Sequence, residues 1–412
     1  MTQEKKHSGT GQDCPKGYKS CDGYRIPKEW HIVRFDSLFS RVTRKNDENN
    51  QNVLTISAQQ GLISQIEYYN TLYASENKTG YTLLHRGDFS YNKSYSSGYA
   101  YGAIKRLDAY EKGIVSPLYL CFTPRQGVNS DFYLQYFEAG CFDREIYKIA
   151  QEGARNHGLL NVSTEDFFHS VLVFPPLEEQ ERITEILTQC DHVIELKEQK
   201  LDELKQLKKE FLRKMFPAKG CDTPEIRFPG FTGAWEQRKL GEIATFINGR
   251  AYSQPELLSS GKYKVLRVGN FYTNDSWYYS DLELGEKYYA DYGDLLYTWS
   301  ATFGPHIWLG DRVIYHYHIW KINLSDQLEK QFAVQLLEQD RTNILSSKNG
   351  STMVHITKEG MEQKDVIIPP STKEQQEIGA FFLQLDNLIT LHQRELEETK
   401  TYKKTLAKLL LT

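Results

Sequence analysis

The chain has 412 residues, of which 40% are hydrophobic and 25% are charged, so it holds enough apolar side chains for more than one hydrophobic core. No run reaches the roughly eighteen apolar residues of a membrane span, and the N-terminus lacks the apolar segment of a signal peptide, which predicts a cytoplasmic protein. A net charge of −4 argues against a protein that coats nucleic acid by bulk positive charge, but it leaves room for a local basic face.

The chain begins with a polar, glycine-rich stretch, residues 1–23, whose lack of aliphatic side chains predicts a mobile extension. Two globular segments, 24–176 and 218–370, then open in the same way, with a tryptophan-led strand that runs into a helical turn. Trp30 of the first segment falls on Trp235 of the second. The shared opening indicates a duplicated unit.

Each globular segment also contains a Gly-Asp turn that enters a strand of alternating apolar and polar residues. Gly87 corresponds to Gly293, and Tyr91 corresponds to Tyr297. We interpret the tryptophans and these glycines as determinants of the fold. Between such landmarks the halves diverge, which suggests two modules that do one job on different targets.

A long helix is predicted after each globular segment, over 177–217 and 371–412. Both helices begin after a diproline, since proline is tolerated only before or within the first helical turn. Apolar residues recur alternately every four and three positions, which is the spacing of a coiled-coil seam. The predicted seam residues are Ile183, Leu187, Ile194, Leu201, Leu204, Phe211, Ile378, Phe382, Ile389, Leu396, Leu406 and Leu410.

These helices decide the predicted fold class. At about 1.5 Å per residue, a helix of about 38 residues is about 57 Å long, which exceeds a compact domain. We therefore expect the two helices to pack on each other as a spacer, although a single such helix would suit packing on a globular core. The predicted fold is α+β, with two related globular α/β domains joined and separated by two long antiparallel helices in pseudo-two-fold symmetry.

The diverged stretches combine bases, tyrosines and small polar side chains, a composition that suits DNA. Lys and Arg would meet phosphates, while Asn, Ser and Tyr offer donors and acceptors to base edges. The alternative for each stretch is an exposed hairpin with no ligand. The candidate DNA-binding residues are Tyr91, Asn92, Lys93, Tyr95, Lys105, Arg106 and Arg155 in the first domain, and Arg267, Asn270, Tyr272, Tyr297, Thr302 and His306 in the second.

Motifs of catalysis are missing from the sequence. It has no P-loop, no HExxH, and no diproline preceded by the Asn or Asp that an adenine methyltransferase would need. The six cysteines are scattered without a CxxC pair, so we expect neither a disulfide framework nor a zinc site. His316 and His318 are spaced like a metal pair on a strand, but without a third ligand nearby we interpret them as hydrogen-bonded or surface histidines.

At these residues the sequence resembles the specificity subunit of type I restriction-modification enzymes. The resemblance covers nearly the whole chain after residue 24, and it rests on the duplication and on two stretches. The first stretch is Phe174-Pro175-Pro176-Leu177-Glu178-Glu179-Gln180-Glu181-Arg182-Ile183, and the second is Pro229-Gly230-Phe231 followed by Trp235-Glu236-Gln237-Arg238-Lys239-Leu240-Gly241-Glu242-Ile243. One departure is the start of the second long helix, 371–375, which is one residue longer and less apolar than the first copy.

The resemblance implies a function. Each globular segment would be a target-recognition domain, and double-stranded DNA would be read as two half-sites separated by unread base pairs. The long helices would dock two methyltransferase subunits, and restriction or translocase subunits would attach through them. The chain itself would do no chemistry, and S-adenosylmethionine, ATP and magnesium would be bound by the partners.

Two alternatives stay open at this point. One is a coiled-coil adaptor whose aromatic domains bind protein or glycan. The other is a stand-alone DNA-modifying enzyme, which would need a cofactor or metal motif.

Overall fold

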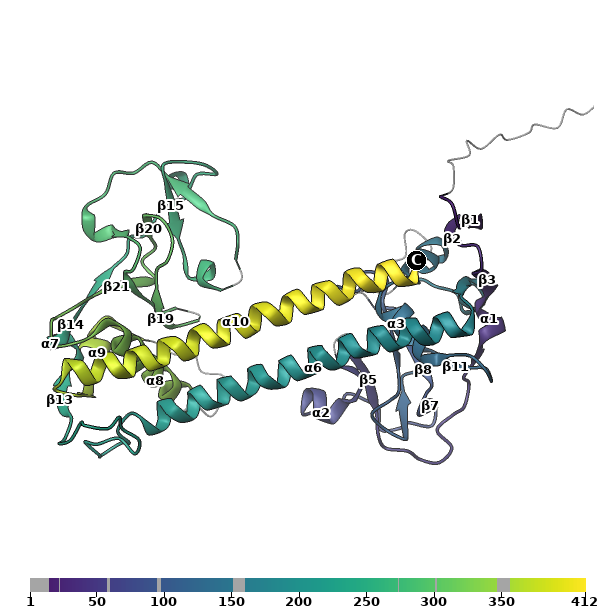
Figure 1. Cartoon of the computed structure of the whole chain (residues 1–412), viewed down its shortest axis with the longest axis horizontal. Helices are drawn as coiled ribbons and strands as arrows, with labels where there is room; N and C mark the ends of the chain where they lie inside the picture. Colours follow the sequence, from purple (N-terminus) through teal and green to yellow (C-terminus); the bar gives the residue numbers. More distant parts are fainter. Residues whose placement is uncertain are drawn as a thin grey trace, which may run out of the picture. The chain divides into compact units, whose positions relative to one another are not determined.

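The computed structural model describes residues 15–21, 23–57, 60–94, 98–150, 160–272, 274–300, 302–346 and 356–412. The chain divides into two compact units. Unit 1 comprises residues 1–196 and 396–412, and unit 2 comprises residues 197–395. Figure 1 shows that each unit combines short strands and helices with part of the two long helices, α6 (Leu177–Lys214, teal) and α10 (Thr372–Leu411, yellow). Within the described ranges no helix is both long and apolar enough to cross a membrane.

Unit 1 contains several small antiparallel sheets, the largest of which has four strands. Its strands are β1 (Tyr18–Cys21), β2 (Tyr24–Pro27), β3 (His31–Arg34), β4 (Phe39–Arg41), β5 (Leu54–Ser57), β6 (Gly61–Ser64), β7 (Thr82–His85), β8 (Phe89–Asn92), β9 (Ala103–Arg106), β10 (Lys112–Val115), β11 (Leu120–Pro124) and β12 (Val171–Phe174). Its shorter helices are α1 (Phe35–Leu38), α2 (Gln65–Tyr69), α3 (Ser130–Glu138), α4 (Asp143–Ile149) and α5 (Thr164–His169). Four strands form one sheet in the order β4-β11-β8-β9, and β3 pairs with β12.

Unit 2 repeats the main sheet of unit 1 and has a second four-stranded sheet with one parallel pair of strands. Its strands are β13 (Glu236–Lys239), β14 (Ala244–Asn248), β15 (Tyr263–Leu266), β16 (Tyr278–Ser280), β17 (Tyr289–Ala290), β18 (Leu295–Thr298), β19 (Gly304–Ile307), β20 (Val313–Tyr315), β21 (Ile319–Leu324) and β22 (Asp365–Ile368). Its shorter helices are α7 (Leu240–Ile243), α8 (Lys330–Ser346) and α9 (Lys358–Glu362), with 3-10 turns η1 (Gln254–Glu256), η2 (Val268–Phe271) and η3 (Glu286–Tyr288). The sheet order β14-β21-β18-β19 and the pair β13-β22 match unit 1, which confirms the duplication.

The landmark residues of the sequence determine local structure in both units. Gly87 and Gly293 have φ of +91° and +86°, a left-handed conformation that strains a residue with a Cβ atom. Each glycine is followed by an aspartate that accepts a backbone hydrogen bond, Asp88 from His85 N at 2.7 Å and Asp294 from Asp291 N at 2.8 Å. The turn that leads into β8 or β18 is therefore built the same way in each unit.

The landmark tryptophans tie each domain to a long helix. Trp30 is buried and its Nε1 donates to Glu179 of α6 at 2.8 Å. Trp235 is also buried, and its Nε1 donates to Glu374 of α10 at 3.3 Å. Because an indole N–H loses its water on burial, the carboxylate partner offsets the cost of desolvating this group.

Both long helices begin at equivalent positions, Leu177 and Thr372, despite the different length of the segment before α10. A buried glutamine in the first turn of each helix donates back to the proline that follows the preceding strand. Gln180 Nε2 lies 2.7 Å from Pro175 O, and Gln375 Nε2 lies 2.9 Å from Pro369 O. These bonds set the direction in which each helix leaves its domain.

The long helices complete the hydrophobic core of each unit. Ile183 and Leu187 of α6 pack in the core of unit 1 together with Leu411 of α10. Ile378 and Phe382 of α10 take the same place in unit 2, together with residues from the last turn of α6. All predicted seam residues are buried or half-buried. The helices run antiparallel in unit 2, where Lys197 is ion-paired with Glu395 and Lys208 with Asp386.

Two expectations about boundaries change. The extension expected over residues 1–23 is ordered in part, because Tyr18–Cys21 form β1 and pair with β2. Residues 1–14 and 22 lie outside the described part of the chain. The compact units also divide α6 and α10 near their middles, since each half of a long helix packs on a different domain.

Candidate nucleic-acid interface

In unit 1, the end of β4, the end of β8 and the turn between β10 and β11 meet around a depression of about 300 Å³. We call Arg41, Thr43, Lys45, Lys93 and Leu118, which line it, the strand-end surface of unit 1. Three of these residues are cations, and no carboxylate lies among the described lining residues. A depression of this kind suits an anion with several oxygens, such as a phosphodiester backbone.

The cations differ in how firmly they are held. Lys93 Nζ donates to Val162 O at 2.7 Å, and burial lowers the pKa of its ammonium group. Lys45 Nζ donates to Gly80 O at 3.1 Å from an exposed position. Arg41 is exposed, and no described carboxylate lies within ion-pair distance of it. Arg41 and Lys45 are therefore better placed to meet a phosphate than Lys93.

In the corresponding region of unit 2, backbone hydrogen bonds hold the strand ends together. Gly249 N donates to Ile319 O at 3.1 Å, as Val42 N donates to Cys121 O at 2.9 Å in unit 1. Trp299 N donates to His318 O at 3.1 Å, which joins the end of β18 to the turn between β20 and β21. We call the side chains brought together here the strand-end surface of unit 2: Arg250, Trp299, His316, Tyr317 and His318.

These side chains form an aromatic cluster. Trp299 meets His318 edge to face, with ring centroids 5.0 Å apart, and its Nε1 donates to Tyr317 O at 2.9 Å. Burial lowers the pKa of His316 to about 4, helped by His318 and Arg267, and burial also lowers the pKa of His318. Both imidazoles are neutral near pH 7, so they offer hydrogen-bonding groups rather than a positive charge. His316 Nδ1 already accepts from His318 N at 3.4 Å, which leaves the Nε2–H of His316 as a donor. This chemistry fits base edges better than phosphates.

The structure overturns several predicted DNA contacts in unit 1. Tyr91 is only 1% exposed, because β8 is an inner strand of the sheet, and its ring stacks on Phe167 with centroids 5.3 Å apart. Lys105 is 5% exposed, and its Nζ lies 2.6 and 2.7 Å from the carboxylate oxygens of Glu138. Both residues stabilise the domain and present nothing to DNA.

Arg106 does not share a surface with Asn92. The register of β8 and β9 pairs Phe89 with Arg106 and Asn92 with Ala103, so the two candidates lie at opposite ends of the hairpin. Arg106 is ion-paired with Asp108 at 2.7 Å and with Asp131 at 2.6 Å. The Asn92 side chain accepts from Ser94 N at 3.0 Å and shapes the turn. Tyr95 and Arg155 lie outside the described residues.

In unit 2 the structure brings several candidates together around Thr298. The Tyr272 hydroxyl lies 3.2 Å from His306 Nε2 and 3.5 Å from Thr298 Oγ1. The His306 ring stacks on Phe271 with centroids 4.1 Å apart. Burial, with a smaller effect of Arg341, lowers the pKa of His306 to about 4. This imidazole is therefore neutral and held in place.

The other candidates of unit 2 divide between structural and exposed positions. Asn270 Nδ2 donates to Asn274 O at 2.9 Å and to Ser276 O at 3.0 Å, and its Oδ1 accepts from Arg267 N, so this side chain holds the η2 loop. Arg267 lies over the Tyr278 ring at 4.2 Å. Tyr297 is fully buried and its prediction as a DNA contact is wrong, because it stacks on Trp320 inside the domain. Tyr272 and Thr302 are exposed.

Sequence reasoning missed two parts of the strand-end surfaces. In unit 1 the run Arg41-Val42-Thr43-Arg44-Lys45 carries three bases within five residues, a signal that was available. In unit 2 the pattern Tyr315-His316-Tyr317-His318 predicts hydrogen-bonded or surface histidines, but nothing in it indicates a contact with DNA. In the described ranges no group of three His, Cys, Asp or Glu side chains is placed to hold a metal ion.

A sequence model of the type I restriction modification DNA specificity domain matches residues 27–206 and again residues 233–401. The chain belongs to this family. The two matches fall on the two halves of the duplication, so this type I specificity subunit carries two DNA specificity domains. The expectation of a non-catalytic DNA-recognition subunit is confirmed, and neither the adaptor nor the stand-alone enzyme is supported.

Known specificity subunits resemble this one over 70% or more of their length. It is 23% identical over 428 residues to the type I restriction enzyme MjaVIII specificity subunit of Methanocaldococcus jannaschii, covering 96% of this chain and 95% of that one. It is 24% identical over 306 residues to the putative MjaX specificity subunit of the same organism, covering 71% and 70%.

Solved structures share the fold. A chain from a study of complex assembly and conformational transition in a type I R-M system aligns with TM-score 0.59 at 16% identity, covering 94% of this chain and 99% of that one. The S subunit of a type I restriction-modification system from M. genitalium aligns with TM-score 0.52 at 14% identity, covering 93% and 96%.

Proposed function

We propose that each unit of this specificity subunit reads one half-site of a bipartite DNA target through its strand-end surface. The observation that carries the proposal is that the same strand ends converge in both units, while the side chains they present differ. A shared scaffold with different side chains is what two recognition domains with different targets require.

The two strand-end surfaces would contribute differently to binding. In unit 1, Arg41 and Lys45 would neutralise phosphates and hold the domain on the duplex, an interaction without sequence information. In unit 2, the neutral His316 and His318 beside Trp299 would meet base edges, where donors and acceptors distinguish base pairs. The exposed Tyr272 and Thr302 would extend that surface.

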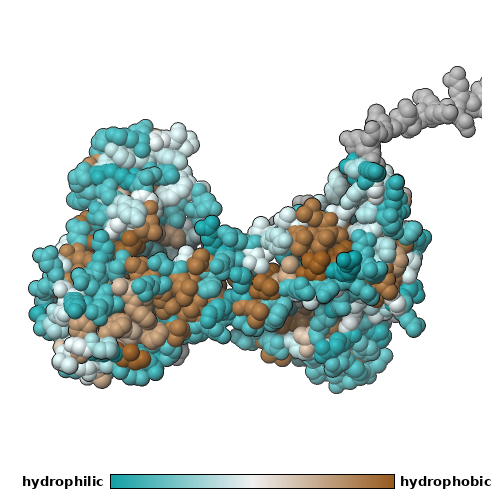
Figure 2. Space-filling view, in the orientation of Figure 1, coloured by the Kyte–Doolittle hydropathy of each residue, from teal (hydrophilic) through white to brown (hydrophobic). Residues whose placement is uncertain are grey.

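Each unit would also dock one methyltransferase subunit on its long helices. Val193 and Leu196 of α6 in unit 1 correspond to Leu388 and Leu391 of α10 in unit 2, and all four side chains are at least 40% exposed. Figure 2 shows such hydrophobic side chains (brown) on the surface of each unit. Leucine and valine exposed at the same place in both units support two copies of one partner. That partner would hold S-adenosylmethionine, and restriction subunits with ATP and magnesium would join through it. Since its target is genomic DNA, the assembly would be cytoplasmic.

Co-expression with a methyltransferase subunit tests the proposal. Native mass spectrometry should show two methyltransferase subunits per chain, and sequencing of the methylated DNA should show two short half-sites separated by unread base pairs. A stable one-to-one complex at saturation, or a single contiguous methylated site, would contradict it.

A further inference from the structure

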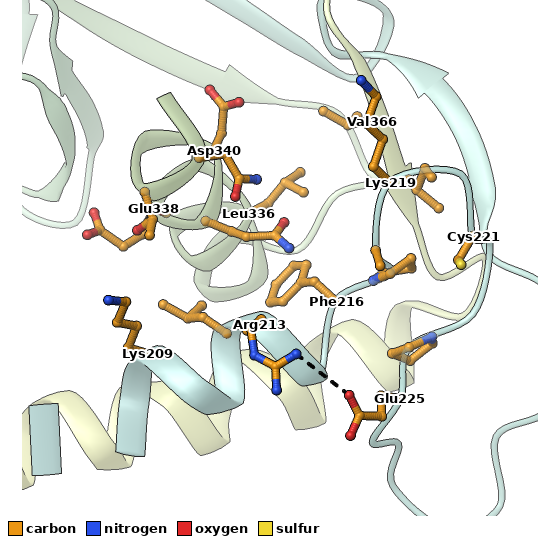
Figure 3. Close-up of a pocket in the computed structure, with 18 of the residues that line it drawn as sticks. Lys209, Arg213, Phe216, Lys219, Cys221, Glu225, Leu336, Glu338, Asp340 and Val366 are labelled. Carbon is orange, nitrogen blue, oxygen red and sulfur yellow. Dashed lines mark hydrogen bonds and ion pairs between the residues drawn. The ribbon is translucent and has the colours of Figure 1, made fainter. Parts of the chain in front are cut away.

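Each unit contains a groove at the same place. It lies between the C-terminal half of a long helix and the first helix after the main sheet, which are α6 and α8 in unit 2 and α10 and α3 in unit 1. In unit 2 a groove of about 1250 Å³ lies between α6, α8 and residues 216–225. Figure 3 shows Phe216 at its centre, with Lys209 and Arg213 of α6 on one side and Leu336 of α8 opposite. In unit 1 a groove of about 570 Å³ lies between α10 and α3.

The grooves match residue by residue along the long helices. The corresponding lining cations are Lys205 with Lys400, Lys209 with Lys404, and Arg213 with Lys408. One further corresponding pair, Lys208 with Lys403, is ion-paired with an aspartate in each unit. The loops of the two halves have diverged. A basic stripe kept in both copies points to one ligand chemistry for both grooves.

The charges of the groove in unit 2 are not balanced within the protein. Its carboxylates are already ion-paired, for example Asp340 with Lys364 at 2.6 Å and Glu225 with Lys214 at 3.1 Å. Lys205 and Lys209 are exposed, and no described carboxylate lies within ion-pair distance of either. The groove therefore has cations available for an acidic ligand.

The groove in unit 1 also has more lining cations than carboxylates, with four lysines against Glu138 and Asp143. Glu138 is taken by Lys105 at 2.6 Å. Lys404 and Lys408 are exposed, and among the residues with a defined position none offers either lysine a carboxylate at ion-pair distance. Lys404 is the counterpart of Lys209, so the same free cation recurs in both units.

Both grooves also have an apolar floor. In unit 2 it consists of Leu212, Phe216, Leu336 and Val366, which are 1 to 8% exposed. In unit 1, Ala407, Phe142 and Ile146 take this place. A basic rim over an apolar floor fits an amphipathic protein segment that buries an apolar side chain and turns carboxylates toward the lysines. A phosphodiester backbone has no apolar side chain to bury on this floor.

We propose that the two grooves are equivalent docking sites for one acidic, apolar-anchored segment of the methyltransferase partner, which occupies both grooves when two copies bind. The inference rests on the proposed function and adds the chemistry of the contact. The exposed leucines of the long helices supply contact area. The basic grooves would select an acidic partner segment, because like charges across an interface strongly disfavour a wrong partner.

Charge reversal in one groove at a time tests this. The full chain is co-expressed with its methyltransferase subunit as wild type, as Lys205→Glu with Lys209→Glu, as Lys404→Glu with Lys408→Glu, and with all four changes. Matched controls are Lys373→Glu on α10 and Arg182→Glu on α6, exposed cations outside the grooves. Partner number is read by native mass spectrometry, affinity by titration, and folding by thermal unfolding.

Wild type should bind two methyltransferase subunits. Each groove variant should bind one, with about tenfold or greater loss of affinity at the altered groove, and the fourfold variant should bind neither. The controls, and the conservative Lys209→Arg, should behave as wild type. Groove variants that keep two partners would overturn the inference while leaving the proposed function intact. Unchanged partner number with weaker, less salt-dependent DNA binding would assign the grooves to phosphates and would also overturn it. If wild type binds no methyltransferase subunit, the proposed function itself fails.

Discussion

Lys208 of α6 contacts Asp386 of α10 at 2.5 Å, and the equivalent lysine of α10, Lys403, is ion-paired with the equivalent aspartate of α6, Asp191. Each long helix therefore supplies the aspartate to one unit and the lysine to the other. In unit 2 the Lys208–Asp386 and Lys197–Glu395 pairs together show that the helices run antiparallel, because the residue numbers rise along α6 as they fall along α10.

The Lys208–Asp386 pair should stabilise unit 2 measurably. The side chains are 19% and 36% exposed, and Asp386 also accepts from Gln335 Nε2 at 3.3 Å. In a double-mutant cycle of Lys208→Ala and Asp386→Ala we expect a coupling free energy of about 0.5 to 1 kcal/mol, in the upper range for exposed pairs. Chemical denaturation gives the free energy of unfolding. A coupling indistinguishable from zero would show that the pair is not stabilising. Glu397→Ala, at an exposed intrahelical pair, is the control.

Arg41→Ala and Lys45→Ala should each weaken binding to all DNA sequences. A variant that lacks one phosphate contact releases fewer counterions when it binds DNA. The slope of log K against log salt should therefore become about one unit less steep. Filter or fluorescence binding at several salt concentrations measures this. Arg34→Ala removes an exposed arginine that is already paired with Asp36 and should change nothing. Equal slopes in wild type and the Arg41 variant would remove that residue from the DNA face.

His318→Ala should relax base preference in one half-site only. A lost contact with a base edge costs about 1 to 3 kcal/mol at one base pair, which broadens the methylated motif at that position. Sequencing of sites methylated by the variant complex shows which half-site changes. His192→Ala, an exposed position on α6, provides the comparison. A motif identical to that of wild type would reject His318 as a reader.

Unit 2 should lose stability in mild acid. The pKa of His306 in the folded protein is about 4, below its ordinary value near 6.5, so folding favours the neutral imidazole. This contribution is complete above about pH 6.5 and is lost as the pH falls through about 4. Between pH 7 and pH 4.5 the Tm of His306→Gln should therefore fall less than the Tm of wild type. Some fall remains in the variant, because the pKa of His316 is also lowered and its protonation also destabilises the folded protein. Parallel Tm curves would contradict the burial argument.

The long helices should set the length of the unread spacer in the target. A heptad inserted after Leu201 and another after Leu396 keep the seam in register and lengthen each helix by about 10 Å, or about three base pairs of DNA. Methylated-site sequencing should show unchanged half-sites with a longer spacer. Insertion of five residues at the same positions breaks the seam and should abolish activity. An active heptad variant with the original spacer would refute this role of the helices.

Much of the architecture follows from sequence alone. Heptad spacing after a diproline predicts α6 and α10, since helix periodicity and proline geometry are local properties. The duplication shows in pairs such as Trp30 with Trp235, because residues that anchor a helix to a domain tolerate little change. The glycines of the Gly-Asp turns are equally local, as a positive φ depends on one residue.

Only the tertiary structure decided which side chains are exposed on the surface that we propose for DNA. Tyr91 and Tyr297 look like recognition residues in a polar, tyrosine-rich stretch, yet strand order places both on inner strands and buries them. The sequence predicts that the charge of Lys105 is available to DNA, but in the folded protein Lys105 is ion-paired with Glu138. Conversely, Arg41 and Lys93 are far apart in the chain and meet only because β4 and β8 flank β11 in the sheet. Periodicity and turn chemistry depend on neighbours in the chain, whereas exposure and charge pairing depend on contacts between distant residues, which one sequence does not specify.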